Sequence, residues 1–131
     1  MNKYRDKSDF EINKAVADCY LTREYRFNSD DKIVELMDID LSCEFGGEIN
    51  LKDKYVTGTF DPCNNPADAM PIIIENKICM AYDVFAEEHD GGNWVAQPAY
   101  GFSNERVRSD NYYRAAMEVF LMMKEAENEK S

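Results

Sequence analysis

Residues 78–98 read ICMAYDVFAEEHDGGNWVAQP, and this stretch decides the fold class of the chain. Its first part, 78–85, alternates two sets of side chains, which is the period of a β-strand. The alternating large apolar positions are Ile78, Met80, Tyr82 and Val84. An acidic turn containing Gly-Gly follows at 87–92, and 93–98 returns as a second strand that ends at a proline. The pattern therefore predicts an antiparallel hairpin, 78–85 paired with 93–98, with a loop over 100–108.

Three stretches with helical periodicity surround this hairpin. The predicted helices lie at about 9–20, 66–76 and 111–124. Ser8 and Glu11 form a capping box at the first, and Asn65 followed by Pro66 is typical of the start of the second. The third is apolar on most sides, so we expect it to be buried on more than one face. Together these elements predict an α+β fold in which a small antiparallel sheet packs with helices.

The remaining segments give weaker signals. Segment 21–59 mixes short alternating apolar runs with turn residues, so we expect a variable, strand-rich segment whose arrangement the sequence leaves open. Segment 125–131 is polar and is expected to be a frayed tail. A chain of 131 residues has the length of one compact domain, so 1–131 is expected to be a single domain.

Acidic residues dominate the composition. Asp and Glu number 26 against 15 Lys and Arg, which gives a formal net charge of −11. This balance argues against direct binding of nucleic acid, because phosphate contacts need a basic surface. No apolar run approaches the roughly 20 residues that a membrane-spanning helix requires, and no apolar stretch follows the N-terminal residues. We therefore expect an acidic cytoplasmic protein with no membrane partner.

The cysteines and the histidine do not suggest a metal centre. The four cysteines are Cys19, Cys43, Cys63 and Cys79, and no two of them form a CxxC pair. The single histidine, His89, lies in the acidic turn of the hairpin. We expect reduced thiols, no bound metal and no cofactor. Motifs of the GxSxG, P-loop and GxGxxG types are absent, so the sequence predicts no catalytic residues.

Three runs carry a family resemblance. They are FDPCNNPADAMPIIIENKI at 60–78, Trp94-Val95-Ala96, and RAAMEVFLMM at 114–123. With the opening around Ser8, these runs resemble the NinX-like family of small phage proteins. The resemblance covers about 7–20 and 60–124 and does not include 21–59. It implies an accessory gene product of a lambdoid phage, located in the cytoplasm of the infected bacterial host. It provides no known site residues. The order of helix, hairpin and helix is also similar to the phage alpha-beta-alpha sandwich domain.

The run after residue 60 contains the best candidate for a ligand site. Its candidate residues are Asp61, Asn64, Asn65, Asp68, Arg114 and Trp94. Free N–H groups at the start of the second helix can hold an anion, Arg114 could complete the pocket, and Trp94 could stack on a base. This predicts sequestration of a small anionic ligand such as a nucleotide signal. The structural alternative is that Asp61 and Asn65 cap turns while Arg114 pairs with Asp68.

A second candidate surface is the acidic stretch between residues 30 and 48. Its acids are Asp30, Asp31, Glu35, Asp38, Asp40, Glu44 and Glu48, and Lys32 is the only basic residue among them. Such a surface could imitate a phosphate backbone and occupy a host protein that binds nucleic acid. The alternative is a solvated face that keeps the protein in solution.

The expected function is therefore non-enzymatic. We expect binding of a host protein through the acidic surface, with interference with host defence as its purpose. Capture of a small anionic ligand is the alternative, and a small enzyme of unknown type is a third. A homo-oligomer remains open because the last helix has more apolar faces than one sheet can cover.

Overall fold

The computed structural model of the chain describes residues 3–39, 54–99 and 106–129. The helices are α1 (Asp9–Tyr20), α2 (Pro66–Glu75) and α3 (Tyr112–Glu129). The strands are β1 (Tyr25–Asn28), β2 (Ile33–Ile39), β3 (Lys54–Phe60), β4 (Ile78–Tyr82), β5 (Trp94–Pro98) and β6 (Val107–Ser109). A short 3-10 helix, Glu88–Asp90, lies between β4 and β5. Among the helices described here, none combines the length and the apolarity that a bilayer crossing demands.

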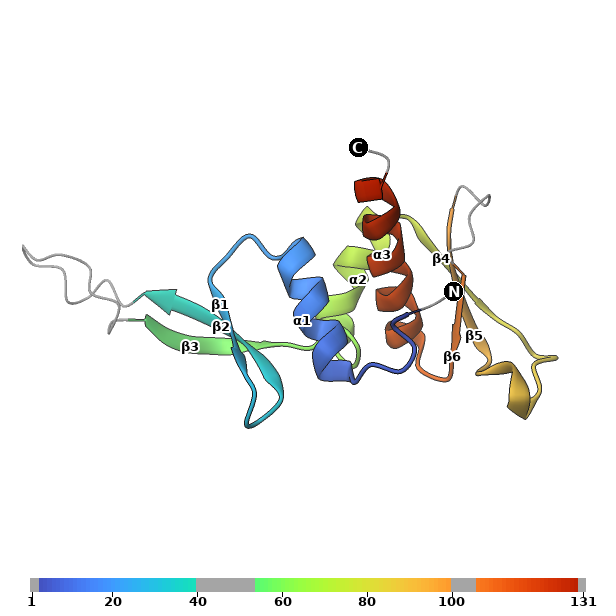
Figure 1. Cartoon of the computed structure of the whole chain (residues 1–131), viewed down its shortest axis with the longest axis horizontal. Coiled ribbons are helices and arrows are strands. Elements are labelled where there is room, and N and C mark those ends of the chain that lie inside the picture. The colour runs from blue at the N-terminus through green and yellow to red at the C-terminus, as the bar shows by residue number, and fades with distance from the viewer. Residues whose placement is uncertain (1–2, 40–53, 100–105, 130–131) are drawn as a thin grey trace, which may run out of the picture.

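The strands form two antiparallel sheets with the helices between them (Figure 1). Sheet A has the strand order β1-β2-β3, and sheet B has the order β4-β5-β6. Sheet A lies at one end of the molecule and sheet B at the other (Figure 1). The predicted α+β class is confirmed. The strand-rich segment that the sequence left open contributes a sheet of its own rather than extra strands beside the hairpin.

The predicted hairpin forms most of sheet B. β4 and β5 pair along their whole lengths. β4 ends at Tyr82, earlier than expected, because the Asp83 carboxylate accepts a hydrogen bond from the backbone N–H of Phe85 at 3.0 Å and turns the chain. β6 adds a third strand beside β5 within the stretch expected to be a loop. This strand has three residues, which is too short for an alternating pattern to reveal it.

The predicted helix starts are confirmed. The Ser8 hydroxyl accepts a hydrogen bond from the backbone N–H of Glu11 at 3.2 Å. The side-chain oxygen of Asn65 accepts one from the N–H of Ala67 at 3.0 Å. Each contact satisfies an N–H group that the first turn of a helix leaves without a partner.

The last helix is longer than expected. It continues past Lys124 to Glu129, so the tail at 125–131 is helical over its described part. The carboxylate of Glu125 accepts a hydrogen bond from the ammonium of Lys3 at 2.6 Å. This contact fastens the last turns of α3 to the N-terminal segment, a tertiary effect that the polar composition of the tail does not reveal.

The core lies among the helices and on the inner face of sheet B. α3 is its centre, since it packs against α1, α2 and all three strands of sheet B. Phe120 on α3 is 1% exposed, and its ring meets that of Tyr20 edge to face with centroids 6.3 Å apart. Sheet A contributes Val34 of β2 and Phe60 at the end of β3 to this core. Burial of the last helix on more than one face is therefore confirmed.

Candidate functional site

The β3–α2 loop, residues 61–65, holds three of the six predicted ligand residues, Asp61, Asn64 and Asn65. The backbone N–H of Asp61 donates to Oδ2 of Asp68 at 2.9 Å. The side-chain amide of Asn65 donates to the same oxygen at 3.2 Å while its own oxygen caps α2. The loop is thus tied to the first turn of α2 by groups that an anionic ligand would otherwise use.

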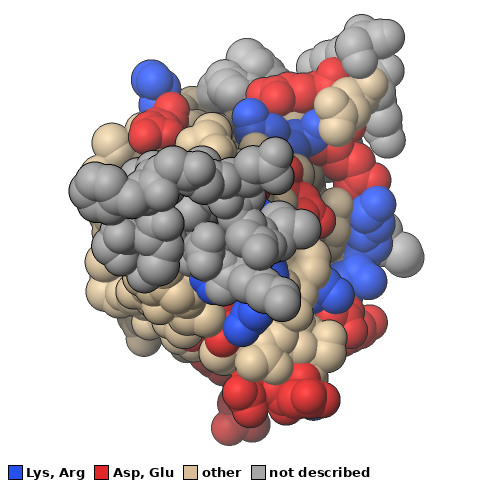
Figure 2. Space-filling view, turned by 90° about the vertical axis from the view of Figure 1, so that its left-hand side faces the viewer, with Lys and Arg blue, Asp and Glu red and all other residues tan. Residues whose placement is uncertain are grey.

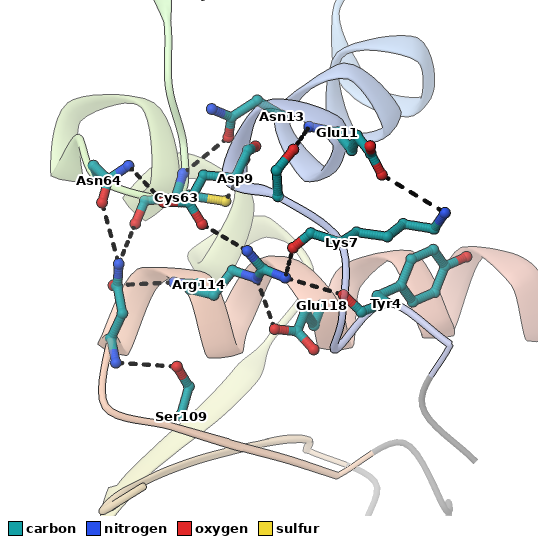
Figure 3. Close-up of polar contacts among 12 residues, drawn as sticks. Tyr4, Lys7, Asp9, Glu11, Asn13, Cys63, Asn64, Ser109, Arg114 and Glu118 are labelled. Carbon is teal, nitrogen blue, oxygen red and sulfur yellow. Dashed lines mark hydrogen bonds and ion pairs between the residues drawn. The ribbon is translucent and has the colours of Figure 1, made fainter. Parts of the chain in front are cut away.

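Two asparagines outside the loop hold it from either side. Asn13 on α1 is 5% exposed and donates to Oδ1 of Asp61 at 2.8 Å. It also accepts the N–H of Cys63 at 3.1 Å (Figure 3). Asn111, directly before α3, donates to the carbonyl oxygen of Cys63 at 2.9 Å and to Oδ1 of Asn64 at 3.2 Å. The loop is therefore a junction between the starts of α1 and α3.

Arg114, in the first turn of α3, has all three guanidinium nitrogens engaged (Figure 3). Nε donates to Oε2 of Glu118 at 2.7 Å, and Nη1 donates to Oδ1 of Asp9 at 2.6 Å. Nη2 donates to the carbonyl oxygens of Tyr4 at 3.0 Å and of Lys7 at 2.6 Å. One side chain thereby joins the N-terminal segment, α1 and α3.

The expected pairing of Arg114 with Asp68 is wrong. The start of α3 lies against the start of α1, so the carboxylate that Arg114 meets is Asp9. Burial lowers the pKa of the guanidinium, but the hydrogen bonds to Asp9 and Glu118 outweigh it and raise this pKa above its ordinary value. Only 12% of the side chain is exposed. Arg114 therefore has little capacity left for a ligand from solution.

Cys63, at the centre of this junction, is a structural residue. It is 0% exposed. Burial raises the pKa of its thiol far above the ordinary value, and the nearby carboxylate of Asp9 adds to the rise. A thiol that stays protonated is a poor nucleophile, so this arrangement does not support cysteine catalysis. Among the described residues, no group of three or more potential ligands is placed to hold a metal ion.

A cavity of about 160 Å³ opens between the starts of α1 and β2 and the β3–α2 loop. Of the six predicted ligand residues, Asp61 and Asn64 line it and the other four do not. Its charged walls are the carboxylates of Asp9 and Asp61 with Lys32 facing them. Pockets for drug-sized molecules usually start at about 300 Å³. The cavity is small for a nucleotide, and the negative charges of Asp9 and Asp61 would repel its phosphates.

Trp94 lies away from the loop, within sheet B. Its ring contacts Tyr82 and Tyr112 edge to face, each with centroids 4.9 Å apart. Tyr113 continues this row of aromatic rings at 5.1 Å from Tyr112. The structure therefore does not bring Trp94 together with Asp61 and Arg114.

The acidic stretch is only partly described. Asp30, Asp31, Glu35 and Asp38 are described, whereas the predicted members Asp40, Glu44 and Glu48 lie outside the described residues. Asp30 and Asp31 are exposed in the turn between β1 and β2, where the N–H of Asp31 donates to the side chain of Asn28 at 3.1 Å. Asp38 is exposed on β2 and stands opposite Tyr55 of β3.

Glu35 does not belong to the exposed acidic surface. It is 8% exposed, and Oε1 accepts a hydrogen bond from Nε of Arg26, its register partner on β1, at 2.6 Å. Figure 2, which views the molecule from the sheet A end, shows acidic side chains gathered at the lower edge and interspersed with Lys and Arg elsewhere. Figure 1 places both the β1–β2 turn and the short helix between β4 and β5 at this lower edge.

Sequence reasoning missed the residues that organise the junction. They are Asp9, Asn13, Asn111 and Glu118. A signal for two of them exists in the sequence, since Asn13 and Glu118 interrupt apolar helical stripes, and a polar residue at such a position needs a buried partner. The identity of that partner depends on how the helices pack.

A model of one protein family, described as bacteriophage P22, NinX, matches residues 3–124 of the chain. This match includes 21–59, which the sequence resemblance did not cover. Comparison with curated proteins and with solved structures gives no significant match.

Proposed function

The chain belongs to the bacteriophage P22 NinX family, and we propose that it is a phage accessory protein that acts by binding a host protein in the cytoplasm of the infected cell. Sheet A is the binding surface in this proposal, and blocking a host defence function is the consequence of binding. The observation that carries the proposal is the position of sheet A, which projects from the helical body (Figure 1). Three of its acidic residues, Asp30, Asp31 and Asp38, are exposed.

The exposed acids of sheet A provide its negative charges, and exposed basic side chains, those of Arg23, Arg26 and Lys32, lie among them. Asp30 and Asp31 occupy the β1–β2 turn, and Asp38 lies on the middle strand. A negative surface attracts a positively charged partner over several ångströms and favours the correct orientation at encounter. The partner that fits is a host protein with a basic surface, of the type that contacts nucleic acid.

Apolar side chains accompany these acids on sheet A. Phe27 is 37% exposed, Tyr55 is 48% exposed and Val56 is 41% exposed. Tyr55 is directly opposite Asp38 in the β2–β3 register. Aromatic residues are enriched at protein–protein interfaces, where they supply contact area that charges alone do not. A purely solvated face would not need them.

Charge reversal on sheet A tests this proposal. We compare Asp30→Lys with Asp38→Lys against a matched pair on other surfaces, Asp6→Lys with Glu127→Lys, which changes the net charge equally. Host proteins are captured from infected lysate, identified, purified and titrated against each variant. We expect the sheet A pair to raise the Kd by about tenfold or more and to flatten its salt dependence. Equal Kd values for the two pairs would exclude sheet A as the binding surface.

Capture of a nucleotide is the competing function. Occupation of Arg114 by Asp9, Glu118 and two carbonyl groups weighs against it. A thermal-shift series with nucleotides decides the matter, because a ligand at a hundred times its Kd stabilises the folded state by about 2.7 kcal/mol. A shift in melting temperature that Lys32→Ala abolishes would favour the ligand site over host-protein binding, because Lys32 is the basic residue that lines the cavity.

A further inference from the structure

The tip of the β4–β5 hairpin lies at the end of the molecule opposite sheet A (Figure 1), and it exposes apolar side chains. Phe85 is 88% exposed and Val84 is 69% exposed, while the neighbouring Tyr82 is 54% exposed. Phe85 is the most exposed large apolar side chain in the described part of the chain. Such a concentration of exposed apolar surface at one place is typical of an interaction site.

The backbone that carries Phe85 is fixed. Asp83 accepts a hydrogen bond from the N–H of Phe85 at 3.0 Å through its side chain, and its carbonyl oxygen accepts from the N–H of Ala86 at 3.3 Å. Asn93 from the returning strand closes the turn, donating from its amide to the Asp83 carbonyl at 3.0 Å and accepting the Asp83 N–H at 2.8 Å. The turn is therefore an ordered element and not a loose loop.

Sheet B anchors this turn. Arg108 on β6 donates to the second carboxylate oxygen of Asp83 at 2.8 Å, and this contact lowers the pKa of Asp83 below its ordinary value. Gly92 has a φ of 134°, and a Cβ at this position would lie 2.2 Å from the backbone carbon of Ser109. The absence of a side chain at Gly92 thus lets the hairpin lie directly against the chain after β6.

A rigid turn that points an aromatic ring into water loses the hydrophobic contribution of that ring to folding. The same rigidity lowers the entropy lost when the ring enters a partner's pocket. Large aromatic side chains in central pockets are frequently the energetic anchors of interfaces. The construction of the turn therefore favours binding rather than folding stability.

The charges next to Phe85 define the partner. Glu87, Glu88 and Asp90 follow directly and are all exposed. Glu87 and Asp90 are held in place because the N–H of Glu87 donates to Oδ2 of Asp90 at 2.8 Å. His89 lies between the carboxylates of Glu87 and Asp90, 3.5 Å from each. The apolar anchor thus stands near three exposed carboxylates, of which that of Asp90 is hydrogen-bonded within the turn.

We propose that this hairpin tip is a second docking surface, in which Phe85 enters an apolar pocket of a partner protein and Glu87, Glu88 and Asp90 meet Lys or Arg residues on the rim of that pocket. The surface is independent of sheet A, so one molecule can hold two proteins or two parts of one protein.

Site-specific crosslinking tests this docking surface. A photoreactive benzoylphenylalanine replaces Phe85 in the full chain expressed in the bacterial host, and a matched chain carries it at Ile74. Ile74 on α2 is 67% exposed and lies on a different element, so it reports nonspecific encounters. We expect a protein adduct at position 85 that is missing at position 74, with the crosslinked peptide next to basic residues.

The purified partner is then titrated against variants of the chain. Phe85→Ala is expected to raise the Kd by about tenfold or more, with an unchanged melting temperature because the side chain is in solvent. Glu87→Lys with Glu88→Lys is expected to weaken binding and reduce its salt dependence, while Ile74→Ala leaves the Kd unchanged. Asp30→Lys with Asp38→Lys also leaves this Kd unchanged, which separates the two surfaces.

Four results would overturn the proposal. The first is the absence of an adduct specific to position 85, and the second is an adduct with another copy of this chain. The third is a contact surface on the partner that lacks Lys and Arg. The fourth is a Kd that Phe85→Ala does not change.

Discussion

The two sheets of this protein are both three-stranded and antiparallel, but they use their faces differently. α3 packs across all strands of sheet B and buries Ile78, Ala96 and Val107. Sheet A meets the helices through Tyr25 of β1, through β2 and through the end of β3, and it leaves Tyr55 and Val56 exposed. One sheet completes the core, whereas the other extends away from it. Residues of sheet B and the helices should therefore dominate stability, while sheet A should tolerate change.

The largest expected effect comes from the centre of the body. Phe120→Ala removes a ring that is 1% exposed and should lower the free energy of unfolding by about 3–5 kcal/mol. The matched change on sheet A is Phe27→Ala, where the ring is 37% exposed, and there we expect a loss below about 1.5 kcal/mol. Urea denaturation measures both. Equal losses would mean that the core around α3 and sheet A contribute equally to the free energy of unfolding.

The next effect is the loss of the arginine that joins three segments. Arg114→Leu leaves Glu118, which is 4% exposed, without its main charge partner and should destabilise the fold by about 3 kcal/mol. Arg114→Leu combined with Glu118→Leu removes both charges and should recover part of this loss. If the unfolding free energy of Arg114→Leu alone lies within about 0.5 kcal/mol of that of the original chain, the buried pair contributes little to stability.

The corresponding ion pair on sheet A is expected to matter less. Arg26→Ala leaves the carboxylate of Glu35 without its partner, but the Arg26 side chain is itself 59% exposed and water can reach the pair. We expect a loss of about 1–2 kcal/mol in urea denaturation. A loss of stability as large as that of Arg114→Leu would contradict the expectation that the helices and sheet B contribute more to stability than sheet A does.

The smallest effect concerns the hydrogen bond between Tyr25 of β1 and Asp18 of α1, which has a length of 2.7 Å. This bond and burial raise the pKa of Tyr25 from 10.0 to about 12. A raised pKa means that the protonated phenol favours the folded state, so this stability is complete below pH 10 and is lost as the pH rises to about 12.

Replacing Tyr25 with Phe should therefore lower the free energy of unfolding by about 1 kcal/mol at neutral pH. It should also remove the part of the alkaline pH dependence that this phenol contributes. Urea denaturation at neutral and alkaline pH measures both quantities. A variant that keeps the full alkaline decline would show that Tyr25 does not couple sheet A to α1.

The parts of the fold that sequence reasoning predicted are those governed by local contacts. The caps of Ser8 and Asn65 identified two helix starts, and the alternation after Ile78 identified the hairpin. Of the predicted capping box, the structure shows the bond from the Glu11 N–H to the Ser8 hydroxyl. β6 was missed because its three residues carry no periodic pattern. The extension of α3 was missed because its last turns are polar and are held by Lys3, far away in the sequence.

The candidate site was predicted less well for the same reason. Of the structural alternative for the loop after Asp61, the cap of Asn65 is present at the start of α2. The predicted pairing of Arg114 with Asp68 was wrong, because Arg114 pairs with Asp9 instead. The sequence placed Glu35 in the acidic stretch. It could not reveal that Glu35 is buried against Arg26, because this contact depends on the register between β1 and β2.

The sequence by itself determined the α+β class, the helix starts, the hairpin and the membership of a phage protein family. The first three follow from periodicity, capping and turn chemistry, which act over a few residues, and the family membership follows from the resemblance of whole sequence runs to that family. Tertiary structure alone decided that the strands form two sheets, that Arg114 is enclosed by protein groups, and that Phe85 stands in solvent on an ordered turn. Each of these depends on which distant segments meet, and residue types do not encode that pairing locally.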